Sequence, residues 1–141
     1  MFEAHKVALV FNGHVHNYQR SHPLRFVPDP PPAGAGGKIF GPNGQVKGRW
    51  TLDTTYDGST HTQPDGVIYI VTGAGGARLY NAEQSGDRAS WQPYTARFIS
   101  NVHSLTVVDV TPGVLTVRQV SSSGDEIDRF VVSRAGAPDQ K

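Results

Sequence analysis

Short apolar runs separated by turn-forming residues are the feature that most limits what this chain can fold into. Its continuous apolar stretches, Val7–Phe11 and Val67–Val71, are five residues long, and 16 glycines and 10 prolines punctuate the sequence. Runs of this length between turn residues are typical of strands, whereas amphipathic helices need longer periodic segments. The sequence therefore predicts a mostly β or α+β fold with largely antiparallel strands and a glycine- and proline-rich loop region.

The order of these segments predicts how the chain is organised. We expect buried strands at residues 6–12 and 67–71, and the stretch 21–38 to be irregular because proline and glycine dominate it. Asn43-Gly44 predicts a hairpin turn before a strand at 46–52. Turn chemistry separates three further strands, which predicts an antiparallel meander of Val102–Val110, Val114–Val120 and Ile127–Ser133. Residues 1–134 read as one domain portion, with a disordered tail at 135–141.

Composition excludes several classes of protein. Hydrophobic residues make up 37% and charged residues 18% of the chain, which argues against disorder. The net charge of +1 gives no electrostatic reason to expect nucleic acid or a membrane surface as partner. The chain has no cysteine, so disulfides, thiol nucleophiles and cysteine zinc sites are excluded. The first residues carry no signal pattern and resemble the end of a helix before a core strand, so we expect a fragment of a longer protein.

Two histidines, His14 and His16, follow the apolar run Val7–Phe11 directly. On an extended chain, residues two apart point to the same side, about 6.5–7 Å apart. That spacing suits two imidazoles that bind two different ions held about 3.5–4 Å apart, as in two-metal hydrolytic sites. The pattern therefore predicts His14 and His16 as metal ligands.

The segment Gly13-His-Val-His-Asn-Tyr-Gln-Arg20 resembles the last signature of the calcineurin-like metallophosphoesterases, in particular the purple acid phosphatase branch. In that family Gly-His-x-His-x-Tyr-x-Arg ends a core strand. Val67–Gly76 and Asp128-Arg-Phe130 are similar to later strands of the same family. The resemblance covers only the C-terminal part of such an enzyme, and it implies the C-terminal half of a four-layer α/β/β/α sandwich.

The resemblance also implies a chemistry. His14 would bind the more exchangeable divalent ion and His16 the neighbouring, often ferric, ion, with zinc, manganese or iron as its companion. In the family a metal-bridging hydroxide hydrolyses a phosphomonoester. The remaining ligands lie on N-terminal motifs that this sequence lacks, so the chain alone should bind metal weakly and be inactive without that half. Many members of this branch are exported, so the resemblance implies that a complete parent protein would be exported as well.

The residues around the histidines have weaker expected roles. Gly13 fits a close bend, and Tyr18 and Arg20 share the histidines' side if the chain stays extended. Asn17 is expected to be an exposed loop residue, or else to reach the substrate. Two further candidates for the rim of the substrate site are His22 and Arg78, the latter after the tight turn Gly73-Ala-Gly-Gly76. A packed or interface role is expected for His103.

Two other classes of function remain open. One is a stand-alone β-rich binding module in which the histidine loop has no metal. The other is a symmetric homo-oligomer in which two copies of the loop meet and form a four-histidine zinc or copper site.

Overall fold

A computed structural model of the chain describes residues 2–31 and 46–134. It is mostly β, and its helical segments are short 3-10 turns. The expected mostly β class with largely antiparallel pairing is confirmed. The turns are η1 (Glu3–His5), η2 (Ala82–Ser85) and η3 (Arg88–Ser90). Within the described residues, no helix has the length and apolar character needed to cross a membrane.

The first sheet has four strands in the order β1-β5-β2-β6. They are β1 (Leu9–Asn12), β5 (Ile68–Thr72), β2 (Tyr18–Ser21) and β6 (Thr95–Ile99). β1 and β5 are parallel, and β2 is antiparallel to both of its neighbours. β1 and β5 therefore end at the same edge of the sheet, where the chain between β1 and β2 turns back.

The second sheet is the antiparallel meander β7-β8-β9 that the turn residues predict. Its strands are β7 (Ser104–Thr111), β8 (Val114–Ser121) and β9 (Glu126–Ser133). Gly113 and Gly124 adopt positive φ in the two connecting turns, a backbone conformation that favours glycine. The prediction of three closing strands is confirmed to within two residues at each end.

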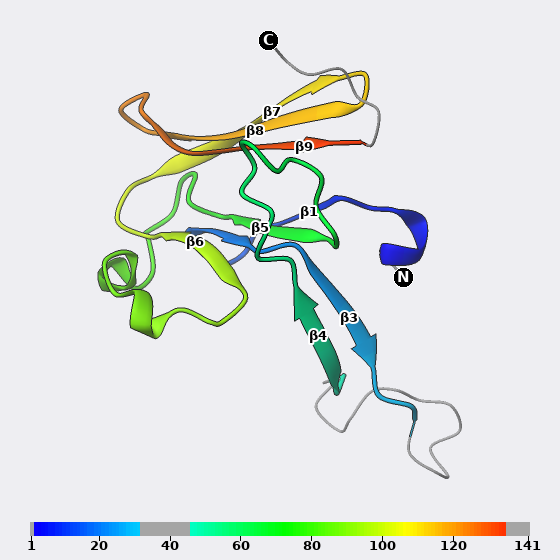
Figure 1. The fold of residues 1–141 in the computed structure, drawn as a ribbon. Helices are drawn as coiled ribbons and strands as arrows, with labels where there is room; N and C mark the ends of the chain where they lie inside the picture. The colour runs from blue at the N-terminus through cyan, green and yellow to red at the C-terminus, as the bar shows by residue number, and fades with distance from the viewer. Residues whose placement is uncertain (1, 32–45, 135–141) are drawn as a thin grey trace.

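A two-stranded ribbon, β3 (Leu24–Pro28) with β4 (Gly48–Leu52), projects from the two layers (Figure 1). The prediction that residues 21–38 are irregular is therefore wrong at Ser21 and Leu24–Pro28, and residues 32–38 lie outside the described residues. Residues 24–27 precede the proline run, and Pro28 can end a strand in an isolated ribbon because edge positions tolerate a missing N–H. The expected Asn43-Gly44 hairpin turn and the tail at 135–141 lie outside the described residues.

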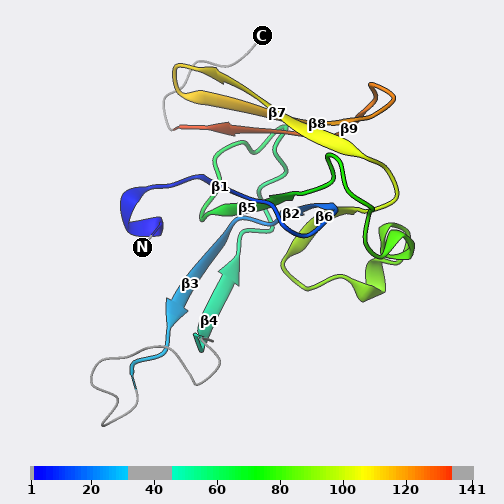
Figure 2. The same cartoon turned by 180° about the vertical axis from the view of Figure 1, so that it is seen from behind.

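The two sheets face one another and enclose the core (Figure 2). The first sheet contributes Tyr18, Ile68, Ile70 and Ile99, and the second Val117, Phe130 and Val132. Parallel pairing explains the buried run at β5, which is central in its sheet. The predicted burial of residues 6–12 is wrong, because β1 is an edge strand whose residues are half-buried or exposed. Strand β6 was not predicted, since residues 77–100 have no sustained period.

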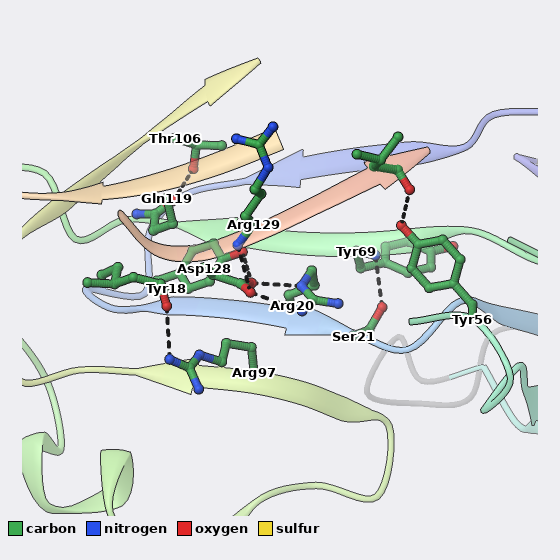
Figure 3. A network of polar contacts seen from close by, with 12 residues as sticks. Tyr18, Arg20, Ser21, Tyr56, Tyr69, Arg97, Thr106, Gln119, Asp128 and Arg129 are labelled. Carbon is green, nitrogen blue, oxygen red and sulfur yellow. Dashed lines mark hydrogen bonds and ion pairs between the residues drawn. The ribbon is translucent and has the colours of Figure 1, made fainter. Parts of the chain in front are cut away.

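A largely buried ion pair joins the sheets (Figure 3). Arg20 donates from Nε to Asp128 Oδ2 at 2.8 Å and from Nη2 to Oδ1 at 3.1 Å. The Tyr18 hydroxyl donates to Asp128 Oδ2 at 2.8 Å, and burial together with the charge of Asp128 raises the pKa of that phenol. The guanidinium also lies over the Phe130 ring, 4.6 Å from its centroid. The contacts of Tyr18 and Arg20 with Asp128, and of Arg20 with Phe130, therefore fix the position of β2 against β9.

Replacing Asp128 by Asn should lower the free energy of unfolding by about 3–5 kcal/mol, because it leaves Arg20 as an uncompensated buried charge. Urea denaturation measures the change. The matched control is Asp109→Asn, which breaks the more exposed pair with Arg118 and should cost under about 1 kcal/mol. Equal effects of the two substitutions would contradict a structural role for the buried pair.

Candidate functional site

The candidate site lies where the parallel strands β1 and β5 end. A histidine loop, residues 13–17, follows β1, and a glycine loop, residues 73–80, follows β5. In open α/β sheets, ligands bind at the carboxyl ends of parallel strands, and the parallel pair of β1 with β5 likewise brings its two following loops to one edge. The two loops bond to each other: Gly73 N–H donates to the Asn17 carbonyl, and Tyr80 N–H donates to the His16 carbonyl, both at 3.1 Å.

The histidine loop is tightly bent, so the expected extended spacing of His14 and His16 is wrong. Val15 N–H donates to the Gly13 carbonyl and Asn17 N–H to the Val15 carbonyl, both at 2.9 Å. His14 adopts φ of 72°, in the left-handed region. This conformation costs a non-glycine residue about 1 kcal/mol. The histidine pair is therefore presented by two successive turns and not by a strand.

The ring of His16 is held on two sides. Its Nδ1 lies 2.8 Å from the carbonyl oxygen of Arg78. A carbonyl oxygen only accepts, so Nδ1 carries the proton and Nε2 keeps the lone pair. The Tyr80 ring stacks on the imidazole with centroids 4.2 Å apart and planes 20° from parallel. The glycine loop thus sets both the orientation and the tautomer of His16, which is what a metal-ligating histidine requires of its neighbours.

Close backbone approach makes Gly73 necessary in this arrangement. A Cβ at Gly73 would lie 2.1 Å from the carbonyl oxygen of Val15. Asn17 is buried at 2% exposure and accepts a 3.1 Å hydrogen bond from Gln19, so its expected exposure is wrong. Its burial follows from the same contact, because the glycine loop covers the end of the histidine loop.

The structure does not bring the other predicted residues to the histidines. The side chains of Tyr18 and Arg20 point into the core toward Asp128, because the bends in the histidine loop change which residues share a side. His22 follows the far end of β2, and burial, with the nearby charge of Arg20, lowers the pKa of its imidazole. Gly13 is exposed, and a Cβ there would meet nothing within 4 Å.

Arg78 is the rim candidate that the structure does place beside the loop. It is exposed, and its backbone carbonyl holds His16. Its guanidinium has no bonding partner among the residues that the structure describes.

No sequence pattern marked two residues that belong to the site. Tyr80 stacks on His16, and the ring of His103 bonds through Nε2 to the Ala77 carbonyl at 3.0 Å. His103 is exposed and anchors the glycine loop, so the packed alternative expected for it is wrong and the interface alternative stays a prediction. No sequence signal marked either contact, since both depend on how far the glycine loop folds back over the β1–β2 connection.

The two imidazoles fit part of a metal site. His16 offers Nε2, and His14 is exposed at the surface of the loop. Among residues 2–31 and 46–134, however, no three side chains of His, Cys, Asp or Glu gather at a point where they would hold an ion. His14 and His16 are therefore not part of such a group among the described residues.

Comparison with known proteins gives no family for this chain: no family model, no curated protein and no solved structure matches it.

Replacing Gly73 by Ala should displace the histidine loop and lower the free energy of unfolding by about 1–3 kcal/mol, because the new methyl group overlaps the Val15 carbonyl. Thermal denaturation and the NMR shifts of His14 and His16 report the two effects. Gly76→Ala is the matched control in the same loop, since a Cβ there meets nothing within 4 Å. Unchanged histidine signals in Gly73→Ala would contradict the proposed contact between the loops.

Proposed function

We propose that this chain supplies His14 and His16 to a binuclear metal centre that hydrolyses phosphomonoesters. It would do so as the C-terminal half of a metallophosphoesterase sandwich of the calcineurin-like, purple acid phosphatase type. The observation that carries the proposal is the restraint on His16, whose Nδ1–H donates to the Arg78 carbonyl and whose ring stacks on Tyr80. That restraint leaves Nε2 as a directed nitrogen ligand.

The strained backbone of His14 supports the same role. A positive φ is uncommon for residues with a side chain, and such conformations cluster at binding sites, where the surrounding structure holds them in place. Glycine would adopt this turn without cost. The cost of this conformation at His14 is compatible with a role of its imidazole in binding, and ligation of a metal is the role that its neighbour His16 also suits.

Neutral imidazoles are ligands for zinc, iron and manganese. Such a metal pair, when bound, lowers the pKa of a water molecule and neutralises charge on a phosphoryl group. Within this chain His14 and His16 would hold the ions, one imidazole for each. The backbone carbonyl of Arg78 binds His16, and the exposed guanidinium of the same residue would bind phosphoryl oxygens.

The proposal requires further ligands from another polypeptide segment. Two imidazoles without carboxylates hold a divalent ion weakly, because nothing bridges the ions or compensates their charge. The N-terminal half implied by the sequence resemblance is the proposed source of those carboxylates. The same half would contain the group that protonates the leaving alcohol.

Zinc titration by calorimetry tests the assignment of the ligands. The chain should bind zinc weakly at two sites, and His16→Ala and His14→Gly should each reduce the affinity of one of these sites by about tenfold or more, since each imidazole would hold its own ion. Glycine at His14 keeps the left-handed backbone and isolates the loss of the imidazole. His61→Ala, at an exposed histidine in another loop, should leave the affinity unchanged. Equal affinity in all four proteins would refute the proposed site.

The chain by itself should not hydrolyse 4-nitrophenyl phosphate at mildly acidic pH with iron, zinc or manganese present, because the bridging carboxylate is missing. Release of nitrophenol, followed by absorbance, is the measurement. Turnover that disappears in His16→Ala would show that the described residues suffice, and the requirement for a second segment would then be wrong.

A further inference from the structure

At one edge of the two-sheet core, apolar side chains on the core-facing side of the meander are exposed. Val108, Val117 and Phe130 lie side by side across the meander and face the first sheet, with 37%, 0% and 1% exposure. In the next row, Val110 is 72% exposed whereas Val132 is 5% exposed. The exposed fraction of these side chains therefore rises toward the β7 edge, on the face of the meander that packs against the first sheet.

The first sheet also has an exposed apolar side chain on its core-facing side. Phe11 of β1 is the partner of Ile70 in the parallel register, so its side chain points to the same face. Ile70 is fully buried, but Phe11 is 43% exposed. Phe11, Val108 and Val110 all line one open groove of about 1220 Å³ between the two layers. Three inward-facing apolar side chains thus lack the packing that their neighbours have.

The opposite edges of both sheets are covered by the chain itself. β9 receives a loop: Val131 N–H donates to the Gly58 carbonyl and Ser133 N–H to the Thr62 carbonyl, both at 2.8 Å. β6 packs against η2, where Ser100 N–H donates to Ser85 Oγ at 2.6 Å. In contrast, β1 and β7 end their sheets in the strand order of the described residues. Edge strands left open in this way are templates for strand addition.

The size and walls of the groove favour a polypeptide. Its volume exceeds the range of roughly 300–1,000 Å³ that is usual for small-molecule sites. It also lies between β1 and β7, each with an edge that pairs with no strand among the described residues, and a small apolar ligand would leave those backbone groups unpaired. An added strand satisfies the backbone and places alternate side chains against the apolar walls.

The charges on the rim favour acidic residues in that strand. Arg25 and Asp65, both at the groove, pair with each other. The Glu3 carboxylate accepts from Phe26 N–H at 3.0 Å. Lys6 and Arg134 line the same groove, and their side chains have no bonding partner among the described residues. These two cations therefore favour a strand that carries acidic residues opposite them.

From these observations we infer that the groove between β1 and β7 is a docking site for an extended polypeptide strand. The strand carries apolar residues at alternate positions, which contact Phe11, Val108 and Val110, and acidic residues near its ends, which pair with Lys6 and Arg134. This inference rests on the packing of the two sheets and not on the metal site, so it stands or fails separately from the proposed function.

Fluorescence anisotropy with a designed peptide tests the site. The probe is a fluorescein-labelled peptide, Glu-Val-Thr-Val-Thr-Val-Thr-Val-Glu, and its control has lysine in place of both glutamates. The acidic peptide should bind saturably and about tenfold more tightly than the basic one, the effect expected of two exposed charge pairs. Absence of saturable binding, or equal binding of the two peptides, would overturn the inference.

Matched variants locate the binding. Val110→Asp puts a negative charge in the groove and should abolish binding of the acidic peptide, because it removes an apolar contact and repels the probe. Val27→Asp changes a valine that is 58% exposed on the projecting ribbon, outside the groove, and should leave binding unchanged. Circular dichroism verifies that both variants fold. Peptide binding that survives Val110→Asp would overturn the inference, and so would a homodimer in light scattering that Val110→Asp dissociates, since a second copy would then be the occupant.

Discussion

The close contact between the backbones of Gly73 and Val15 is the constraint on which the candidate site depends. Because Gly73 has no side chain, the glycine loop can lie against the histidine loop and form hydrogen bonds with it in both directions. Those bonds bury Asn17, bring the Arg78 carbonyl to His16, and seat Tyr80 on the imidazole ring. Parallel pairing of β1 and β5 places the loops at one edge, but the glycine allows them to touch.

The second constraint is the buried junction of Tyr18 and Arg20 with Asp128. It ties β2, which leaves the histidine loop, to the last strand of the other sheet. A charge-assisted, bidentate pair in a partly dry environment has a strict geometry, so it fixes where β2 begins. The histidine loop is thereby anchored at its end by a residue network more than one hundred positions away in the sequence.

The sequence was informative where local chemistry decides the structure. Turn residues at Gly113 and Gly124 predicted the meander, and the run Val67–Val71 predicted a buried strand. It was uninformative where tertiary contacts decide. The spacing of His14 and His16 suggested an extended chain, but the bends follow from hydrogen bonds within the loop. The roles of Tyr18 and Arg20 depend on Asp128, and no local pattern connects residues so distant in the chain. The apolar run Val7–Phe11 predicted a buried strand. The described residues leave this segment half-buried or exposed, and the open groove lies beside it.

A histidine NMR experiment tests the central claim, that the glycine loop prepares His16 as a metal ligand, most directly. Long-range proton–nitrogen spectra of the metal-free chain, followed by addition of zinc, report the tautomer and the nitrogen that binds. We predict that His16 carries its proton on Nδ1, and that zinc shifts the Nε2 signal of His16, together with signals of His14, before those of His5, His22, His61 and His103. A proton on Nε2 of His16, or zinc shifts spread equally over all six histidines, would contradict the account.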